Sequence, residues 1–533
     1  MKKTGIVSGI VFAVLIFSSS CKIMQSSKLN EVQLTEEFID GNIFEASIDF
    51  YERFLYENPN DPDFNYKMGF ALLNTKGREK ESIKYFKKAK DNFNKPKTLN
   101  RYVESSFQLA RAYRASYLFI AALQELAQLR SVVEKNPDVS AVIDREIFKC
   151  ESGKRLFENK IKFEITNLGD SINSEFQDHS PVISADESVL IFTSRRPNGW
   201  DEEIDEDGNY NEDIFISEKV DGHWTKAEGI KSINTKNHEA TCSLSPDGQT
   251  LFIYKADDYG SIYQSTLENN GWSKPVKLGP NINTENRETH ASISADGKQL
   301  YFTSDRPGGF GGLDIYVSEK MKNGMWGPPR NLGEGVNTKY NEEGPYIHPD
   351  GKTLYFSSKG HENLGGYDIF KSEKTQFGTW TKAENIGYPI NTVGDDVFYM
   401  PTADGQHAYY SSRRSPDASD NDIFLITLDS VKRSDITVMV GNVFAKCSPE
   451  IPGNVKIKVK DTETGNEYHI RPNPKNKRFI FIAKWGKTYN ISVSVNDEII
   501  FTDKLTISPD NAPKMMKYKS IRIDPEINCN PTP

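Results

Sequence analysis

The chain has 533 residues and a formal net charge of −9, which gives it length for about three domains. The acidic balance argues against a nucleic-acid partner, because binding to phosphate backbones depends on an excess of Lys and Arg. Five cysteines are too few for a disulfide scaffold, and none has metal-ligand spacing. These exclusions leave a multidomain globular protein as the class that fits the length and composition.

The N-terminus has the pattern of a targeting segment. Lys2 and Lys3 precede an apolar run from Ile6 to Phe17, and three serines then lead to Cys21. The run is too short to span a bilayer comfortably. Residues 1–20 resemble a lipoprotein signal peptide, which implies that Cys21 carries lipid. The alternative is an ordinary signal peptide in which Cys21 is incidental.

Residues 21–30 then form a linker. Lys22 disfavours retention at the inner membrane, and no acidic surface-export tract follows it. Lipid on Cys21 would allow stable anchoring, although one chain alone binds only marginally. We therefore expect an outer-membrane lipoprotein that faces the periplasm.

Residues 31–157 have the apolar periodicity of helices. Three helix pairs align on small and aromatic residues, which are Ala46, Phe50 and Pro59, then Gly69, Leu72, Ser82, Phe86 and Ala89, then Ala110, Tyr113, Ala122, Leu126 and Pro137. This pattern resembles the tetratricopeptide repeat, which implies a concave surface for peptides or partner proteins. The alternative is a helical spacer that only positions the next domain.

Five copies of one pattern occupy residues 161–430. Each has an Asn-Thr or Asn-Ser corner and, 13 residues later, an Asp at a tight turn, and both sets advance by 61, 49, 54 and 54 residues. The corners begin at Asn173, Asn234, Asn283, Asn337 and Asn391. The turn aspartates, expected to be structural anchors, are Asp186, Asp247, Asp296, Asp350 and Asp404. Repeats of this length with several short strands predict a five-bladed β-propeller.

The ring of blades is predicted to close through its ends. Phe163 to Gly169 matches the segments that end in Leu278-Gly279 and Leu332-Gly333, so an N-terminal strand is expected to complete the fifth blade. Ser-Pro-Asp-Gly at 245–248 and Ser-Asp-Arg-Pro-Gly-Gly at 304–309 resemble the Tol-B-like, WD40-related repeats of bacterial periplasmic proteins. In three copies an aspartate opens a later strand of the repeat and is expected to hold the loop before that strand. These residues are Asp314, Asp368 and Asp422.

Residues 435–525 contain alternating, apparently antiparallel strands, which predict a small β-sandwich before a tail at 526–533. The turns and strands resemble the carboxypeptidase-regulatory-like domain, which is transthyretin-like and has no catalytic residues of its own. Cys447 and Cys529 flank the sandwich and are candidates for a disulfide in an oxidising periplasm. Cys150 and Cys242 are expected to be isolated buried thiols.

Catalytic motifs are missing from the sequence: we find no Gly-x-Ser-x-Gly, phosphate loop or His-Glu-x-x-His. His179, His238 and His290 recur near the first three corners, where the later copies have Glu343 and Asp395. A polar ring of this kind is more typical of a channel lining or a stabilised corner than of catalysis. No catalytic residues are therefore predicted.

An acidic insert in the first copy is the one candidate metal site. Alternating oxygen ligands surround Gly208 at Asp205, Asp207, Asn209, Asn211 and Asp213. Calcium prefers such ligands, but the closing Glu of a helix–loop–helix site is missing, so a solvated loop is the alternative. No other cofactor is expected.

The order of parts resembles the periplasmic multidomain lipoprotein of type IX secretion and gliding machinery. An outer-membrane-protein-A-like, peptidoglycan-binding domain usually follows the sandwich in that family, and none is expected here, so any link to peptidoglycan is indirect. The resemblance implies a non-enzymatic scaffold whose partners are outer-membrane or periplasmic proteins of the secretion machinery. The alternatives are a glycan- or peptidoglycan-binding lipoprotein and a propeller glycoside hydrolase, which needs two carboxylates across a cleft.

Overall fold

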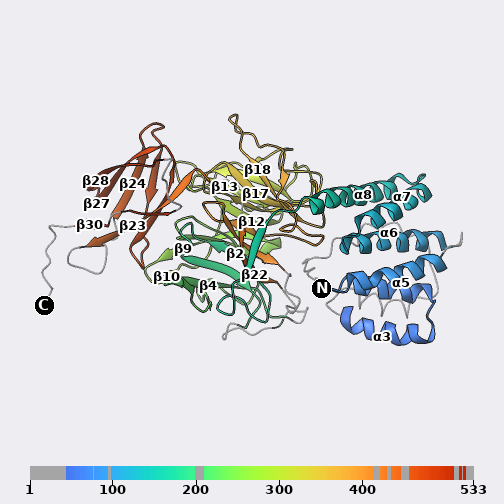
Figure 1. Ribbon diagram of the computed structural model, residues 1–533. Coiled ribbons are helices and arrows are strands. Elements are labelled where there is room, and N and C mark those ends of the chain that lie inside the picture. Colours follow the sequence, from blue (N-terminus) through green and yellow to red (C-terminus); the bar gives the residue numbers. More distant parts are fainter. Residues whose placement is uncertain are drawn as a thin grey trace. The chain divides into compact units, whose positions relative to one another are not determined.

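The computed structural model describes residues 44–75, 77–93, 98–197, 204, 209–412, 421–428, 434–445, 455–508, 515–518 and 520–523. The chain divides into two compact units, Met1–Lys154 and Arg155–Pro533, which we call the helical unit and the β unit (Figure 1). Among the described residues, the last α-helix is α8 (Pro137–Glu158), which begins in the first unit and ends in the second.

Six α-helices follow one another in the described N-terminal part (Figure 1). They are α3 (Phe44–Glu57), α4 (Pro62–Leu73), α5 (Glu79–Asn92), α6 (Leu99–Ala115), α7 (Phe119–Val132) and α8 (Pro137–Glu158). Asp61 caps α4 by accepting from the Phe64 N–H at 2.9 Å, and Pro62 occupies the first helical position, where it has no N–H to lose.

Small residues allow these helices to approach closely. A Cβ added at Gly69 of α4 would lie 2.9 Å from the Phe86 ring of α5, and one at Gly153 would lie 2.6 Å from the Phe119 ring. The buried side chains around Phe86 include Leu109 and Ala112 of α6, so the aromatic ring fills the layer between the helices. Among the described helices, none is both long and apolar enough to cross a bilayer.

In the described part of the β unit, five antiparallel sheets each come from one copy of the repeat. The first contains β2 (Asp178–Ile183), β3 (Val189–Ser194), β4 (Asp213–Val220), β5 (His223–Trp224) and β6 (Glu228–Gly229). The second contains β7 (Glu239–Leu244), β8 (Thr250–Lys255), β9 (Ser261–Glu268), β10 (Gly271–Trp272) and β11 (Val276–Lys277). The third contains β12 (Glu288–Ile293), β13 (Gln299–Ser304), β14 (Asp314–Glu319) and β15 (Arg330–Asn331). The fourth contains β16 (Glu342–Ile347), β17 (Thr353–Ser358), β18 (Asp368–Glu373) and β19 (Glu384–Asn385).

The fifth sheet joins strands from both ends of the repeat region. It contains β20 (Tyr399–Pro401), β21 (His407–Ser412), β22 (Asp422–Leu428) and β1 (Phe163–Asn167). Strand β1 pairs antiparallel with β22, with Phe163 opposite Leu428 and Asn167 opposite Phe424. The predicted pairing of the N-terminal segment with the last copy is confirmed, and it covers an edge that would otherwise be open.

The first strands of the sheets lie side by side in chain order, which gives the unit a propeller-type arrangement. Strand β2 contacts β7, β7 contacts β12, and β12 contacts β16, while β2 also contacts β20 and β21 of the fifth sheet. The hairpins between first and second strands need a positive φ, which glycine adopts at no steric cost. Gly297 provides it in the third copy at φ 69°, whereas Glu187 adopts φ 56° in the first.

Two further sheets follow with a separate core. One contains β23 (Ile436–Ala445), β26 (Arg478–Lys484), β29 (Met515–Lys517) and β30 (Ile521–Ile523). The other contains β24 (Val455–Asp461), β25 (Glu467–Ile470), β27 (Thr488–Val495) and β28 (Glu498–Thr506). Side chains from both sheets share one buried cluster. The expectation of purely antiparallel strands is wrong, because β23 pairs in parallel with β29 and with β30.

These C-terminal sheets pack on the turn ends of the repeat strands. Ala185 and Ala403, beside two of the turns, share a buried cluster with Val438 of β23 and Ile480 of β26. The Gln249 amide donates to the Arg471 carbonyl at 2.9 Å. The opposite ends of the first strands, near the corners, therefore face away from these sheets.

Candidate functional site

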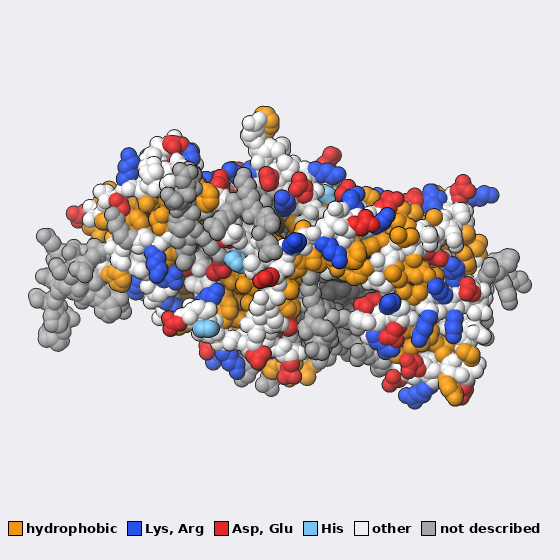
Figure 2. Space-filling view, viewed as in Figure 1, with side chains coloured by type: hydrophobic (Ala, Val, Ile, Leu, Met, Phe, Trp, Pro, Cys, Tyr) orange, Lys and Arg blue, Asp and Glu red, His pale blue; other side chains and the backbone are white. Residues whose placement is uncertain are grey.

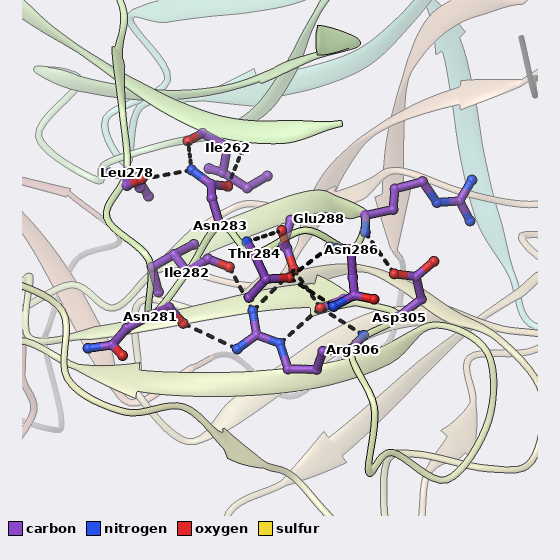
Figure 3. A network of polar contacts seen from close by, with 12 residues as sticks. Ile262, Leu278, Asn281, Ile282, Asn283, Thr284, Asn286, Glu288, Asp305 and Arg306 are labelled. Carbon is purple, nitrogen blue, oxygen red and sulfur yellow. Dashed lines mark hydrogen bonds and ion pairs between the residues drawn. The ribbon is translucent and has the colours of Figure 1, made fainter. Parts of the chain in front are cut away.

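Each corner asparagine ties its sheet to the third strand of the preceding sheet. Asn283 accepts from the Ile262 N–H at 2.8 Å and donates to the Ile262 and Leu278 carbonyls at 2.8 and 3.0 Å (Figure 3). The other four asparagines make the same two-way bond to Ile423, Ile214, Ile315 and Ile369. Asn173 thereby joins the first sheet to the fifth, so the ring of contacts is continuous.

A buried carboxylate follows every corner asparagine by five residues. The set is Asp178, Glu239, Glu288, Glu342 and Asp396, each at most 2 % exposed. In Figure 3, Glu288 accepts from the N–H and the hydroxyl of Thr284, both at 2.9 Å, and the same pair of bonds recurs at all five corners. Sequence reasoning missed this set, although aligning the five copies on their asparagines places an acid at this position every time.

Most of these carboxylates have a partner that offsets their burial. Arg196 pairs with Asp178, Lys255 with Glu239 and Arg306 with Glu288, at 2.5, 2.8 and 3.2 Å. Tyr410 donates its hydroxyl to Asp396. In the fourth copy Gly360 stands where the third has Arg306, and Glu342 has no cation among the described residues. Burial accordingly raises the pKa of Glu342 to about 7.

The predicted anchor aspartates lie at the turns and hold them. Asp296 accepts from the Ser294 hydroxyl at 2.6 Å and from the Lys298 N–H at 3.1 Å, and Asp186, Asp247 and Asp404 repeat this arrangement. Asp350 instead accepts from the N–H groups of Lys352 and Thr353, at 2.7 and 2.9 Å. Asp186 also binds Arg478 of β26. We find these aspartates at the end of the strands that the C-terminal sheets cover.

The carboxylates that open the third strands hold loops. Asp314 accepts from the Phe310 N–H at 2.5 Å, and Asp368 accepts from the Leu364 N–H at 2.8 Å. Asp422 instead accepts from the side-chain amide of Asn167 on β1 at 2.9 Å, and the loop that it was predicted to hold lies outside the described residues. Burial, together with repulsion from Asp396, raises the pKa of Asp368 to about 8. These contacts stabilise the loops and leave little of the carboxylates for a ligand.

The side chains that break the repeat gather around Phe398. We call His179, Glu212, His238, His290, Glu343 and Phe398 the Phe398 cluster. The Phe398 ring lies with its centroid 6.2 Å from the ring of His179 and 5.3 Å from that of His290, so it contacts residues of the first and third sheets from the fifth. Its backbone is left-handed, with φ 58°, a conformation that L-residues adopt at a cost and that concentrates at functional sites.

Register shifts in the strands change the direction in which these side chains point. The ladders between first and second strands shift register between His179 and Val182, between Thr241 and Ser243, between Glu288 and Ala291, and between Glu343 and Tyr346. Bulges at one level of neighbouring strands re-aim side chains and are frequent beside active sites. Four sheets thus deviate at the level where the Phe398 cluster forms.

Glu212 is the ionised carboxylate of the cluster. Its oxygens lie 3.4 Å from His179 Nε2 and 3.9 Å from His238 Nδ1, and its side chain is 28 % exposed. Burial raises the pKa of Glu212, but His179, with His238 and Arg195, outweighs that effect and holds the pKa below its usual value. Glu212 is therefore charged at neutral pH and partly accessible.

Glu343 is the second carboxylate of the cluster, and it interacts electrostatically with His290. It accepts a hydrogen bond from the Tyr367 hydroxyl at 2.9 Å. Burial lowers the pKa of the neighbouring His290, and Arg287 and His179 add to that effect while Glu343 opposes it. His290 is therefore neutral at pH 7 and presents an uncharged ring beside Phe398. The cluster combines two carboxylates, a neutral imidazole and a half-buried aromatic ring.

The histidines singled out in the sequence thus separate in role. His179 and His290 contact Phe398, and His238 Nδ1 accepts a hydrogen bond from the backbone N–H of Glu212 at 3.2 Å. Asp395 lies in the adjoining loop and accepts from the Tyr367 N–H at 2.8 Å. Phe398 and Glu212 were not predicted, since only the packing of sheets that are distant in the sequence brings them to the histidines. A signal for Phe398 existed, because the copies carry Ser180, Thr241, His290 and Gly344 at the same offset.

The other predicted residues are only partly described. Cys21, Cys447, Cys529, Asp205 and Asp207 lie outside the described residues. Asn211 donates to the Lys236 carbonyl at 3.2 Å, Asp213 opens β4, and Asn209 lies in the bend before it. Within the described ranges, no group of three His, Cys, Asp or Glu residues is placed to hold a metal ion. Cys150 and Cys242 are free thiols, and burial raises the pKa of each to about 12.

No family model and no curated protein matches the sequence. Solved structures do match, at low overall similarity. A putative TolB from Agrobacterium tumefaciens is 16 % identical, with 61 % of this chain and 98 % of that chain covered and a TM-score of 0.30. An α-L-arabinofuranosidase from Lactobacillus brevis is 14 % identical, with 50 % and 97 % covered and a TM-score of 0.34. The Bacteroides ovatus protein described as Xyloglucan PUL GH43B is 12 % identical, with 64 % and 92 % covered and a TM-score of 0.30.

This comparison corrects one expectation from the sequence. The chain was predicted not to be an enzyme, and that prediction is contradicted, because several of the matching structures are arabinofuranosidases and xylosidases. The physical reason for the error lies in the search for repeated residues. Glu343 was noted only as the residue that a later copy carries in place of a recurring histidine, and Glu212 was not noted, so the two were never weighed as a pair of carboxylates.

Proposed function

We propose that the β unit acts on glycans at the Phe398 cluster, as a glycoside hydrolase of the propeller type. The observation that carries this proposal is that Glu212 contacts His179 and Glu343 interacts electrostatically with His290, the two histidines whose rings lie beside the half-buried Phe398 ring. Hydrolysis of a glycosidic bond needs two carboxylates in different environments, one of them ionised. Glu212 is held ionised by two histidines, whereas Glu343 is held by a tyrosine hydroxyl.

The roles follow from those environments. Glu212 is assigned as the ionised group that attacks the anomeric carbon or activates the water that does so. Glu343 is assigned as the general acid, which in its protonated form gives its proton to the departing oxygen as the glycosidic bond breaks. Phe398 offers an apolar face to a sugar ring, and binding sites generally combine such faces with a few convergent polar groups.

The test is turnover on aryl glycosides and on plant and bacterial polysaccharides, followed by reducing-end release. Glu212→Gln and Glu343→Gln should each lower kcat by at least a hundredfold, and Phe398→Ala should chiefly raise KM. Glu384→Gln is the matched control, since its side chain is 72 % exposed on β19. Wild-type protein that neither cleaves nor binds any of these glycans would exclude the proposal. Binding without cleavage would reduce it to glycan recognition.

The finer architecture belongs to the same proposal. We infer that the five sheets are the blades of a closed propeller, that the last two sheets are a transthyretin-like sandwich, and that the helices are tetratricopeptide-like repeats. The two-way asparagine bond from the first sheet to the fifth supports closure. Removing the amide by Asn173→Ala should then destabilise the propeller as much as the same change at Asn283, and an effect near zero would argue for an open ring.

We also place the protein at the outer membrane, anchored through lipid on Cys21 and facing the periplasm, where glycans of the envelope are accessible. The charged and apolar N-terminal pattern supports this placement. Cys21→Ala should release the protein into the soluble periplasmic fraction. Retention of that variant in the outer membrane at wild-type yield would exclude the lipid anchor.

A second candidate function is docking of an envelope protein, such as a component of a type IX secretion system. Large apolar side chains on the helical unit support it: Tyr56 is 90 % exposed and Ile120 62 % exposed. Figure 2 shows apolar side chains among charged ones on the visible face of these helices. Deleting residues 31–157 should abolish co-purification with an envelope partner, and unchanged co-purification would remove the helices from that role.

A further inference from the structure

One arginine beside the Phe398 cluster has no partner for its charge. Arg287 directly precedes β12 and interacts electrostatically with His290, whose ring contacts Phe398. Its side chain is half-buried, and nothing in the described ranges accepts a hydrogen bond from its buried Nε. Within the same ranges, no carboxylate oxygen lies within 4.0 Å of its guanidinium. Partial burial of an unpaired charge costs free energy, which a ligand of opposite charge would offset.

The backbone around Arg287 is held in place. Its N–H donates to Asp305 Oδ1 at 2.7 Å, and the N–H of Glu288 donates to the Gly260 carbonyl at 3.3 Å. Gly260 has φ 108°, and a Cβ added there would lie 3.3 Å from Arg287 Cγ and 2.8 Å from the Tyr254 ring. Glycine at this position therefore allows the side chains of Arg287 and Tyr254 to approach the same segment.

The Tyr254 hydroxyl is a second donor beside Arg287. Tyr254 is half-buried, and its hydroxyl makes no hydrogen bond to another described residue. Burial raises the pKa of Tyr254; Arg287 opposes that effect and Glu212 adds to it. The hydroxyl is therefore protonated at pH 7. Because Tyr254 interacts electrostatically with both Glu212 and Arg287, the guanidinium belongs to the same surface as the Phe398 cluster.

The carboxylates on this part of the surface have other partners. Glu343 accepts from the Tyr367 hydroxyl at 2.9 Å, and Asp257 accepts from the Tyr263 hydroxyl. The contacts of Glu212 with two histidines are described above. Arg287 is therefore not the counter-ion of any of these acids.

The corner of the third copy does not need this arginine in order to fold. Four residues after the corner asparagine, where the third copy has Arg287, the other copies carry Gln177, His238, Asn341 and Asp395. The other arginine near Glu212, Arg195, donates to the Tyr210 carbonyl at 2.7 Å. An unpaired guanidinium at this position is thus particular to one copy, as is typical of a residue that serves a ligand.

The chemistry of the guanidinium indicates the charge of that ligand. Arginine binds a carboxylate through two parallel N–H bonds, because the planar fork of donors matches the two oxygens. The hydroxyls of a neutral sugar offer neither the charge nor that pair of acceptors. A sugar with a carboxylate offers both, and the Tyr254 hydroxyl can donate a further bond to the same group.

We propose that the glycan bound at the Phe398 cluster carries a carboxylate, as a uronic acid does, and that Arg287 and the Tyr254 hydroxyl bind this group. The inference rests on the proposed glycan hydrolysis and names its substrate class. Acidic sugars gain a charge-assisted interaction that their neutral counterparts lack. Arg287 determines specificity in this account and takes no part in breaking the bond.

The test compares oligogalacturonate and glucuronoxylan fragments with the methyl esters of the same oligosaccharides, which keep the sugar and remove the charge. The full-length protein in detergent should have a kcat/KM at least tenfold higher on the free acids. Arg287→Gln should lower that ratio at least tenfold, mainly through KM, and Arg287→Lys should recover part of it by restoring the charge. Arg330→Gln is the matched control, because Arg330 is exposed on β15, the outer strand of the same sheet.

The outcomes separate this inference from the proposed function. Equal cleavage of acids and esters, or an unchanged ratio in Arg287→Gln, would overturn the carboxylate site and leave glycan hydrolysis standing. A preference for sulfated glycans over uronic acids would also overturn it, as would a lower Tm of Arg287→Gln with equal losses on acids and esters.

Binding decides the matter if no glycan is cleaved. Calorimetry with oligogalacturonate then measures the site without turnover. Binding that Arg287→Gln weakens at least fivefold would support the carboxylate site while excluding hydrolysis. Absence of binding would remove both proposals.

Discussion

Replacing the corner asparagine Asn283 by alanine tests the central structural claim, that these side chains hold neighbouring sheets together. Asn283 is 6 % exposed and makes three hydrogen bonds, two of them to the backbone of Ile262, which is fully buried. The substitution leaves the Ile262 N–H without a partner and removes two further bonds, one to the Leu278 carbonyl and one to the Ile262 carbonyl, which still accepts from the Leu278 N–H at 3.1 Å. A lost bond costs about 1 kcal/mol net, and a buried group left unsatisfied costs about 1–3 kcal/mol.

We therefore expect Asn283→Ala to lower the free energy of unfolding of the β unit by about 3–5 kcal/mol, a large share of the about 5–15 kcal/mol typical of domains. Urea unfolding followed by tryptophan fluorescence reports this transition, since Trp272 and Trp326 belong to the adjoining core. Asn270→Ala is the control: Asn270 is exposed in a turn, and its loss should change stability by less than about 0.5 kcal/mol.

The variant Asn283→Asp sharpens the test, because aspartate keeps the acceptor for the Ile262 N–H but places charge against two carbonyls. It should be less stable than Asn283→Ala at pH 8 and should recover relative to wild type at pH 5, where the buried acid is protonated. A loss below about 1 kcal/mol for Asn283→Ala would refute the reasoning, since it would mean that water or backbone movement satisfies the Ile262 N–H.

Three other outcomes are expected. Glu342 has a folded-state pKa of about 7 against an ordinary value of 4.5, so the folded protein keeps a proton that the unfolded chain has lost, and its stability falls as pH rises from about 4.5 to 7. Glu342→Gln should remove about 3 kcal/mol of that decline, measured by urea unfolding at a series of pH values. An unaltered pH profile would contradict the assignment. Deleting residues 163–167 should expose the edge of β22 and cause aggregation measurable by light scattering, whereas a soluble, equally stable variant would show that β1 is dispensable. Gly69→Val should lower helical stability by about 1–3 kcal/mol in thermal circular dichroism, because its Cβ meets the Phe86 ring at 2.9 Å, and an unchanged Tm would mean that the ring moves aside.

Much of the fold could be predicted because the turns and strands of the repeat depend on residues that are close together in the sequence. Asp-Gly turns need a positive φ, and short aromatic runs favour strands, so the sequence around Asp296 and Gly297 specifies a hairpin without reference to distant residues. The equal steps between copies extend that prediction to every sheet, and the matching segment at 163–169 predicts the pairing of β1. The parallel pairing of β23 was not predictable, because the register of a small sheet depends on which edge the chain returns to.

The candidate site was harder to predict, because its members come from different sheets. His179, His290 and Phe398 are distant in sequence and acquire a common environment only when the ring brings their strands together. Glu212 precedes a third strand, and nothing in its neighbours along the chain distinguishes it from other acids near the insert. The titration behaviour of Glu212, and of Glu342 in a corner without a cation, depends on burial and on partners that only the folded chain provides.

The amino-acid sequence by itself therefore determined the elements of this protein and their number, since turn geometry and apolar periodicity act between residues that are close along the chain. The tertiary structure decided how enclosed each carboxylate is. Glu288 and Glu343 are both acids near corners, but the first is enclosed by threonine, serine and arginine, whereas the second accepts from the Tyr367 hydroxyl and interacts with His290. That difference arises from packing across sheets, because desolvation and electrostatic interactions depend on distance in space and not on separation in sequence.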